Sequence, residues 1–378
     1  SRQYKTSPFA QQLLDILHSL RVPTWSKVAS PSAVAVHKVS GSLTNAVFFV
    51  SSPTSRTLLL RIYGPSSGSL ISRPRELHTL HVLSATYHMG PRVYGTFDNG
   101  RIEEYFDSVA LSASEMRDQR TSRFIGARMA ELHSVDVAAL DDHPSPHRLI
   151  TAEKNVLSWI SPARRVLANP TVPDSARKAL DLDTFHQAWS RYVARLKASD
   201  KASSGPSVFC HNDAQYGNLL RLHKLKEDVP EHHEIIVVDF EYAGPNPAAF
   251  DIANHFHEWT ANYHSTTPHL LDSTRYPTPV DRDNFYRAYL SHRQLPLPSG
   301  RMTAYLSLPA ELQADELSTL EYQVRAWSPM SHAMWAIWGI VQAREDIEAG
   351  VAEPEFNYVE YARCRMAGFY DALDALDL

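Results

Sequence analysis

The apolar and polar positions of the first 63 residues predict one helix followed by three strands. From Phe9 to Leu20 the apolar residues recur at helical spacing, which predicts an amphipathic helix. Residues Ala33 to Val39 alternate between apolar and polar, and two apolar runs follow, Ala46 to Val50 and Thr57 to Tyr63. Alternation and short apolar runs are typical of strands, and the last run carries one charge, Arg61, which needs a partner if it is buried.

Residues 75–106 continue this pattern with a helix and a hairpin. Arg75 to Leu83 has helical periodicity, and its Glu76 is a candidate partner for Arg61. Two strand-like runs, Gly90 to Phe97 and Arg101 to Phe106, flank an Asn-Gly turn. Because Asn-Gly is a strong hairpin signal, we expect these runs to pair as antiparallel strands.

The rest of the chain is mainly helical in pattern. Helical spacing recurs at Ser122 to His133, around Val156, at Phe185 to Leu196 and in the block from Ser328 to Tyr370. We expect three prolines to break the helical patterns between residues 136 and 200: Pro162, Pro170 and Pro173. The charged stretch from Leu222 to Glu234 is expected to be a solvated turn between two strands.

Two polar clusters follow two short apolar runs in the middle of the chain. Val208-Phe209-Cys210 leads into His211-Asn212-Asp213, with Asn218 five residues after the aspartate. Ile235 to Val238 leads into Asp239-Phe240-Glu241. Asp and Asn have poor strand propensity, so clusters of them at the ends of strands indicate a functional site.

These residues can carry out phosphoryl transfer. Asp213 can accept the proton of a substrate hydroxyl, and Asn218 and Asp239 offer the hard oxygen ligands that Mg²⁺ prefers. The order base Asp, metal Asn five residues later, then metal Asp is the kinase arrangement. Gln215 and Glu241 are further candidates for positioning the substrate or the metal. The alternative is a turn in which Asp and Asn only bond the backbone.

Composition narrows the function classes. With 43% hydrophobic and 21% charged residues, the 378-residue chain is typical of globular proteins large enough for two lobes. The net charge of −5 does not suggest a nucleic-acid partner, and no apolar run approaches membrane-spanning length, so we expect no stable membrane insertion. The histidines between His211 and His257 lack the H-E-x-x-H spacing of zinc sites, so no histidine metal centre is expected.

The motifs HNDxxxGN, DFEY and FDIANHFxEW resemble the two signatures of the choline/ethanolamine kinase family. The resemblance covers most of Val39 to Tyr370. It implies an α+β, two-lobed protein-kinase-like fold, with a small antiparallel-sheet N-terminal lobe and a mostly helical C-terminal lobe. We expect residues 1–106 to form the nucleotide-binding lobe, and residues 107–378 to carry the catalytic loop and the choline pocket.

The resemblance also implies how ATP is bound. The small-residue turn that contains Ser42, Thr44 and Asn45 is similar to the family's nucleotide loop. Arg61 lies in the family's L-L-R-x-Y-G segment and is expected to contact phosphate, although a salt bridge at the rim is the alternative. The segment resembling the interlobe hinge is expected to present its backbone to adenine: Glu103, Glu104, Tyr105 and Phe106.

For choline, the resemblance implies an aromatic cage. A quaternary ammonium donates no hydrogen bonds, so aromatic faces and a carboxylate hold it. Glu258 is the expected counter-charge, and the expected walls are Tyr263, Trp335, Trp338, Phe356 and Tyr361. From spacing alone, tryptophans one helical turn apart, such as Trp335 and Trp338, are more often plain core.

We therefore predict an enzyme that transfers phosphate from ATP, with Mg²⁺, to the hydroxyl of choline, the first step of the phosphatidylcholine branch. Ethanolamine kinase or a dual enzyme is the alternative, and a pseudokinase used as a binding module is a more distant one. An aminoglycoside kinase is disfavoured because it would need an acidic pocket and not an aromatic one. A metal-dependent hydrolase is disfavoured because it would need clustered His or carboxylate ligands, which the sequence does not indicate. The resemblance further implies a cytoplasmic protein and a possible homodimer.

Overall fold

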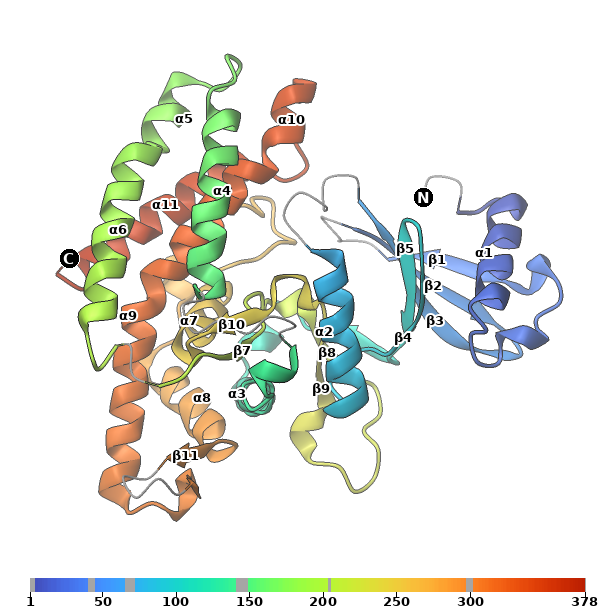
Figure 1. The fold of residues 1–378 in the computed structure, drawn as a ribbon, viewed down its shortest axis with the longest axis horizontal. Coiled ribbons are helices and arrows are strands. Elements are labelled where there is room, and N and C mark those ends of the chain that lie inside the picture. Colours follow the sequence, from blue (N-terminus) through green and yellow to red (C-terminus); the bar gives the residue numbers. More distant parts are fainter. Residues whose placement is uncertain are drawn as a thin grey trace. The chain divides into compact units, whose positions relative to one another are not determined.

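The computed structural model describes residues 4–39, 45–64, 72–140, 149–202, 205–296 and 302–377, and its fold is drawn in Figure 1. The chain divides into two compact units. The first contains residues 1–109 together with two short returns of the chain, Leu222–Lys224 and Val238–Glu241. The second contains the remainder. Asp239 and Glu241 therefore belong to the first unit, although they lie far along the sequence.

The first unit is built on a five-stranded antiparallel sheet of strand order β1-β2-β3-β5-β4. Its elements are α1 (Ser7–Ser19), β1 (Ala35–Lys38), β2 (Asn45–Ser52), β3 (Ser55–Tyr63), α2 (Arg73–Thr86), β4 (Val93–Phe97) and β5 (Gly100–Glu104). The predicted helix, strands and hairpin of this region are confirmed, with bounds that differ by a few residues.

The two faces of this sheet differ in chemistry. One face buries Phe48, Leu58, Leu60 and Ile102 in a core that also contains Leu17 of α1, the helix at the N-terminal end in Figure 1. Side chains alternate along a strand, so the residues between these face the other way. There Arg61 of β3 lies opposite Arg101 of β5 in the register, and both are buried. Two buried cations in adjacent strands require carboxylates around them.

The second unit is mostly helical. Its elements are α3 (Gln119–Leu132), α4 (Thr151–Leu167), α5 (Asp174–Ala179), α6 (Leu182–Ala198), β7 (Val208–Cys210), β8 (Leu219–Leu222), β9 (Ile235–Val237), β10 (Gly244–Asn246), α7 (Ala248–Glu258), α8 (Pro279–Ser291), β11 (Gln294–Pro296), β12 (Met302–Ala304), α9 (Ala310–Gln342), α10 (Arg344–Ala349) and α11 (Tyr358–Asp374). A further short strand, β6 (Ser108–Ala110), precedes α3.

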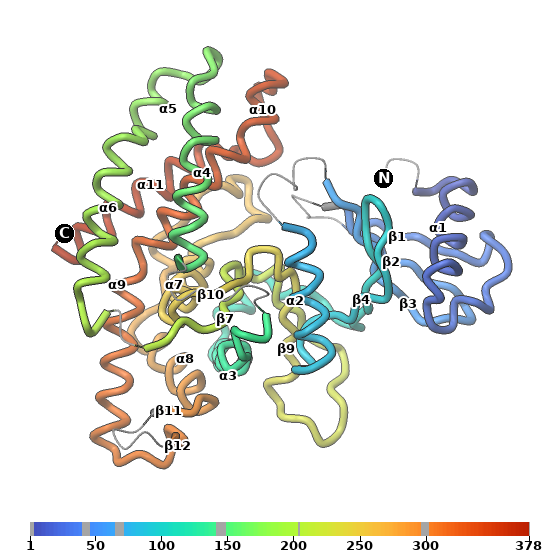
Figure 2. Tube along the Cα trace, viewed as in Figure 1, coloured from blue at the N-terminus to red at the C-terminus, as the bar shows by residue number. Residues whose placement is uncertain are grey.

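Helix α9 is the central support of the second unit. It runs through 33 residues, and α4, α7 and α11 all pack against it, as the trace in Figure 2 shows. Short strand pairs complete this unit: β7 pairs with β10, and β8 pairs with β9. The predicted strands that precede the two polar clusters are thus present. No helix in the described parts of the chain has the length and apolar character needed to cross a membrane.

One expectation about the helices was wrong. Pro162 does not break the helical pattern but lies inside α4. An internal proline costs a helix about 3 kcal/mol or more. Helix α4 buries Val156, Trp159 and Ala163 on one face, and burying large apolar side chains contributes about 1.5–3 kcal/mol each. Tertiary packing therefore outweighs the local preference. Pro170 and Pro173 do lie between helices, after α4 and before α5.

Candidate active site

The loop after β7 holds Asp213 through its own backbone and side chains. The Asn218 amide Nδ2 donates to the backbone oxygen of Asp213 and to its carboxylate Oδ2, both at 2.9 Å. The backbone N–H of Asp213 donates to His211 Nδ1 at 3.2 Å. Asp213 itself is half-buried. Since Asn218 uses its amide nitrogen on Asp213, its amide oxygen is the atom available to a cation.

Gln215 shapes the same loop. Its side-chain oxygen accepts from the backbone N–H of Gly217 at 2.7 Å and caps the 3₁₀ turn Tyr216–Asn218. This contact fixes the position of Asn218 relative to Asp213. The role proposed for Gln215 in positioning the substrate or the metal stays a prediction.

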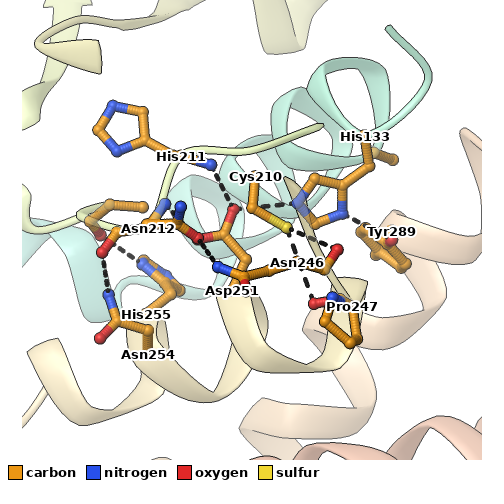
Figure 3. Close-up of polar contacts among 12 residues, drawn as sticks. His133, Cys210, His211, Asn212, Asn246, Pro247, Asp251, Asn254, His255 and Tyr289 are labelled. Atoms are coloured by element: carbon orange, nitrogen blue, oxygen red, sulfur yellow. Dashed lines mark hydrogen bonds and ion pairs between the residues drawn. The ribbon is translucent and has the colours of Figure 1, made fainter. Parts of the chain in front are cut away.

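The loop is fixed from beneath by one buried carboxylate, as Figure 3 shows. Asp251, on the first turns of α7, accepts the backbone N–H groups of His211 and Asn212, both at 2.8 Å. His133 of α3 bonds the same carboxylate at 3.0 Å through Nε2, and its Nδ1 meets the Tyr289 hydroxyl at 2.8 Å. Residues at the C-terminal end of α3 and within α7 and α8 therefore hold the backbone that precedes Asp213.

Burial and hydrogen bonding oppose each other at Asp251. Burial favours the neutral acid, but the bonds from His133 and the His211 N–H hold the pKa of Asp251 below its ordinary value. Burial lowers the pKa of His133, because it penalises the imidazolium. The pair is therefore an ionised carboxylate accepting from a neutral imidazole. This explains why the loop backbone can rely on Asp251 as an acceptor at neutral pH.

Asn212 has an unusual backbone and a fully bonded side chain. Its φ is +66°, a left-handed conformation that Asn tolerates better than most residues. Its amide donates to the Tyr242 backbone oxygen at 2.8 Å and accepts from Asn246 at 2.7 Å. Asn246 in turn accepts from the Ala152 N–H at 3.1 Å, at the start of α4. Together these bonds hold the turn that carries Asp213.

In the first unit, Asp239 is bound by Arg61. The two lie 3.0 Å apart, Nη1 to Oδ2, and Arg61 Nε lies 3.6 Å from Glu103 Oε1. Burial alone would lower the pKa of Arg61, but Asp239 and Glu103 raise it above its ordinary value. Asp239 has a φ of +69°, again left-handed. The buried charge of β3 therefore has its partner 178 residues away in the sequence.

The expectation that Glu76 pairs with Arg61 was wrong. Glu76 bonds Arg101 Nη2 at 2.8 Å and Arg73 Nη1 at 2.7 Å. Arg101 also donates to Glu103. The register places Arg101 directly opposite Arg61, so the carboxylate of α2 meets the second cation and leaves the first to Asp239.

Three carboxylates of the first unit gather where a cation could be held. Glu76, Asp239 and Glu241 each place an oxygen within 4.8 Å of the other two. The Glu241 side chain is 5% exposed, and burial together with the charge of Asp239 raises its pKa to about 8. A carboxyl that keeps its proton beside another carboxylate gains from a cation that neutralises both. The donor set, all hard oxygens, fits Mg²⁺.

Most of the residues expected to bind ATP lie in the first unit. Glu103 is buried and occupied by Arg101 and Arg61. The backbone N–H of Glu104 donates to Arg92 O at 2.8 Å, within the hairpin. The Tyr105 ring packs edge-on against Phe49 at 5.0 Å, and the Phe106 carbonyl accepts from Ser108 at 3.0 Å. The adenine contacts expected of this segment stay a prediction.

Ser42 and Thr44 lie outside the described residues, so the nucleotide-loop prediction for them stays open. Asn45 is the first residue of β2, where its backbone pairs with Tyr63, and its side chain also lies outside the description.

The five aromatic residues expected to form a cage are all in the second unit and are in contact. Ring centroids lie 6.3 Å apart for Tyr263 and Phe356, 5.6 Å for Phe356 and Tyr361, 5.9 Å for Tyr361 and Trp338, and 5.2 Å for Trp338 and Trp335. Each of these rings except the half-buried Tyr263 is buried. We call these five rings the aromatic row.

Glu258, the expected counter-charge, already has two partners. Its Oε1 lies 2.5 Å from Arg365 Nη2, and its Oε2 accepts from the Tyr263 hydroxyl at 2.7 Å. Arg365 also donates to the Tyr361 hydroxyl at 3.0 Å. Glu258 and Arg365 are both buried, so the carboxylate is compensated within the protein. Its prediction as a counter-charge for substrate remains untested.

The aromatic row and the loop that carries Asp213 are joined by hydrogen bonds. The Tyr216 hydroxyl, from the loop, accepts from the Tyr263 N–H at 2.7 Å, and the two rings lie 5.7 Å apart. Asn254 accepts from Trp335 Nε1 at 2.7 Å and donates to the Asn212 backbone oxygen at 3.1 Å. Burial raises the pKa of Tyr361, and the charge of Asp213 is among the further causes. The row therefore lies within electrostatic reach of the Asp213 carboxylate.

The family model described as "Choline/ethanolamine kinase" matches residues 36–370. The chain belongs to the choline/ethanolamine kinase family. Choline kinase of Schizosaccharomyces pombe is 32% identical over 98% of this chain and 90% of its own length. A probable choline kinase 2 of Arabidopsis thaliana is also 32% identical, over 98% of this chain and 93% of its own length.

Among solved structures, choline kinase from Cryptosporidium parvum has a TM-score of 0.71 at 24% identity, and covers 97% of this chain and 96% of its own. At 24% identity this similarity establishes the fold alone. It confirms the predicted α+β kinase-like fold, with an antiparallel sheet in one unit and mainly helices in the other. As a family member, the chain is a kinase that uses ATP.

Sequence reasoning missed several residues that hold this family's motifs in place. Arg101 could have been found by the argument used for Arg61, because it too is a charge within a predicted strand. His133 follows directly after α3 and Asn254 lies in α7, and the sequence does not distinguish a buried polar residue at such positions from an exposed one. Arg365 gave no signal in the sequence, and its burial in α11 became visible only in the structure.

Proposed function

We propose that this enzyme transfers the γ-phosphate of ATP to the hydroxyl of choline and releases phosphocholine and ADP. Family membership over residues 36–370 and relatives named choline kinase support this reaction. The observation that carries it is the bonding of the aromatic row to the catalytic loop, through Tyr216 to Tyr263 and through Asn254 to Trp335. An onium head against those faces would bring its hydroxyl toward Asp213.

Asp213 is the proposed base. Its half-buried carboxylate is oriented by Asn218, so it can accept the proton of the attacking hydroxyl while the phosphoryl group is transferred. His211 takes no proton in this scheme. It accepts the backbone N–H of Asp213 and so helps to orient the carboxylate.

Asn218 and Asp239 are the proposed Mg²⁺ ligands, with Glu241 nearby as a positioning group. Asn218 keeps its amide oxygen for the cation because its amide nitrogen is bonded to Asp213. Bound Mg²⁺ neutralises phosphate charge as it develops in the transfer. Arg61, which ion-pairs with Asp239, is placed to fix that carboxylate and is proposed to contact ATP phosphate.

For the nucleotide we propose the first unit. Residues 1–106 are the proposed nucleotide-binding lobe, with phosphate at the turn of Ser42, Thr44 and Asn45 and adenine at Glu103 to Phe106. Residues 107–378 are the proposed lobe for the catalytic loop and choline. Two groups in the hinge segment, the Glu104 N–H and the Phe106 carbonyl, are already bonded within the protein. The adenine contact therefore falls on the remaining groups of this segment.

Choline is the proposed preferred substrate, and the aromatic row supports it. A trimethylammonium group is held by ring faces at about 0.5–2 kcal/mol per contact, whereas the ammonium of ethanolamine also requires hydrogen-bond acceptors. The carboxylate bonded to the row, Glu258, is compensated by Arg365 and accepts from Tyr263. A row whose carboxylate is already satisfied favours the cation that needs no acceptor.

We propose further that the product feeds phosphatidylcholine synthesis, that the enzyme is cytoplasmic, and that it forms a homodimer. A size measurement in solution tests the last of these. The expectation of no nucleic-acid partner rests on the net charge of −5.

The experiment that tests the function is release of ADP from Mg-ATP with choline, ethanolamine and an aminoglycoside compared side by side. Choline-dependent turnover well above that with ethanolamine is the expected result. A higher kcat/KM for ethanolamine would support the proposed kinase chemistry but contradict the proposed role of the aromatic row as a cage for choline. No turnover with any acceptor would contradict the proposal and point to a different alcohol or a binding module.

A further inference from the structure

Two adjacent histidines and a distant glutamate converge outside the regions used for phosphoryl transfer. His232 and His233 lie on the 3₁₀ turn Glu231–Glu234, between β8 and β9, and Glu131 lies near the end of α3. Glu131 Oε1 is 2.6 Å from His232 Nε2 and 3.1 Å from His233 Nε2. All three belong to the second unit. The sequence separation of about a hundred residues hid this arrangement.

We propose that Glu131, His232 and His233 form a binding site for a divalent transition metal ion, with Zn²⁺ as the ion that this ligand set best fits. The three ligand atoms lie within 4.8 Å of one another. A zinc ion bound at about 2.0–2.2 Å from two imidazole nitrogens and one carboxylate oxygen needs only small adjustments of that spacing. Two His and one carboxylate, with the remaining position open to water, is a known zinc ligand set.

The side chains of Glu131, His232 and His233 are partly exposed, so an ion could reach them from solvent. The side chains are 11% exposed for His232, 24% for Glu131 and 36% for His233. The ring of His292 stands edge-on to that of His232, 4.6 Å away, and closes one side. An ion entering between the histidines would therefore keep a path to water.

The ligand atoms already face one another, because both histidines bond the same carboxylate oxygen through Nε2. A metal ion bound by both Nε2 atoms would leave the proton of each neutral imidazole on Nδ1.

Arg128 limits the affinity of the site. Its guanidinium bonds the other oxygen of Glu131, Oε2, and so leaves Oε1 to the histidines. The arginine orients the carboxylate, but its positive charge repels a second cation nearby. We therefore expect binding of one ion per chain at an affinity below that of structural zinc sites that contain cysteine.

The test uses the full chain, stripped of metal and kept in excess Mg²⁺ so that the oxygen ligands of the phosphoryl-transfer region are occupied. Co²⁺ is titrated as a spectroscopic substitute for Zn²⁺, and the visible absorbance of low-coordinate cobalt is followed. We expect one equivalent to produce the band and Zn²⁺ to displace it. The double variant His232→Gln/His233→Gln should lose the band, with apparent affinity at least about 100-fold lower.

Two further variants make the result decisive. His223→Gln is the matched control, because His223 lies between the same strands and bonds a carboxylate, Asp107, at 2.8 Å, but belongs to none of the candidate metal-binding groups found among the described residues. It should bind cobalt as the wild type does. Glu131→Gln keeps an oxygen acceptor for the histidines and should weaken binding by about 10–100-fold. Absence of the band in the wild type, or an equal band in the double variant, would overturn the proposal, whatever acceptor the kinase uses.

Discussion

Each of the two units holds one of the aspartates proposed for phosphoryl transfer at a turn with a left-handed residue, but the two units hold them with different interactions. In the first unit Asp239 is held by an ion pair with Arg61, within a network of buried arginines and glutamates. In the second unit the turn before Asp213 is held by hydrogen bonds from backbone amides to Asp251 and among the amide side chains of Asn212 and Asn246. One frame is ionic, and the other relies mainly on neutral donors.

This difference indicates what each aspartate can do. Asp239 receives a guanidinium nitrogen of Arg61, so its carboxylate is held in a fixed position beside a buried positive charge. Asp213 accepts the amide N–H of Asn218 from its own loop. The proposal of Asp213 as base and Asp239 as metal ligand follows this difference in surroundings.

The largest expected effect tests whether Asp213 is needed for turnover and not for folding or ATP binding. Asp213→Ala should lower kcat by about a thousandfold or more, because the proposed base is lost, while ATP binding and the melting temperature change little. Turnover and calorimetric ATP binding measure the two quantities. If this variant keeps near-normal kcat, the base is not Asp213.

The next largest effect tests the frame of the second unit. Asp251→Asn should reduce the free energy of unfolding by about 3 kcal/mol, because a buried ionised acceptor of two backbone N–H groups is replaced by an amide. Denaturant unfolding measures it. Asp272→Asn is the control, since Asp272 caps an exposed turn, and it should change stability by less than about 1 kcal/mol. Equal losses of unfolding free energy in both variants would mean that the buried Asp251 carboxylate contributes no more stability than an exposed cap.

A smaller effect tests the ionic frame of the first unit. Arg61→Lys keeps the charge but cannot contact Asp239 and Glu103 with separate nitrogens, so Asp239 loses its fixed orientation. We expect kcat/KM for ATP to fall by about 10–100-fold with little change in KM for choline. Arg56→Lys, at an exposed arginine of the same strand, is the control. A fall in kcat/KM for choline without one for ATP would contradict the proposed contact of Arg61 with ATP phosphate.

A still smaller effect tests the aromatic row. Phe356 has aromatic neighbours and an apolar side chain, so Phe356→Leu removes a ring face while leaving the hydrogen bonds of the row's other side chains in place. KM for choline should rise by about 2- to 30-fold, and KM for ethanolamine by less. Phe369→Leu, among the rings of Phe185 and Tyr192, is the matched control. Equal changes for both substrates would make the row plain core.

The smallest effect concerns the pH dependence of the first unit. Burial and the charge of Asp239 raise the pKa of Glu241 to about 8, against the opposing charges of Arg61 and Arg73 and with a further contribution from Glu76. The folded chain therefore keeps a proton that the unfolded chain loses near its ordinary pKa. This contribution to stability is complete at pH below about 4 and is lost as pH rises through about 8.

Mg²⁺ binding at these carboxylates should release that proton. Its affinity should accordingly rise by up to about tenfold per pH unit between pH 6 and 8 and level off above. Isothermal titration in two buffers of different ionisation enthalpy measures the proton release. Glu241→Gln should abolish the slope, and a slope that persists in that variant would assign the proton to another group.

Much of the fold could be predicted from the sequence because it depends on near neighbours. The alternation of Phe48 and Val50 gives a strand with one buried face, and Asn-Gly between two runs gives a hairpin. The contact of Asn218 with Asp213 spans five residues and follows from a short turn. Local backbone preference and a two- or four-residue period are enough to predict such features.

The tertiary structure decided which charges meet. Arg61 binds Asp239 and not Glu76 because the strand register puts Arg101 opposite Arg61, and Arg101 takes the carboxylate of α2. Pro162 stays in a helix because α4 packs against α9. Glu131 meets two histidines a hundred residues away. Partners of this kind depend on how whole elements pack, and the energies that select them are set by burial, which a run of residues does not contain.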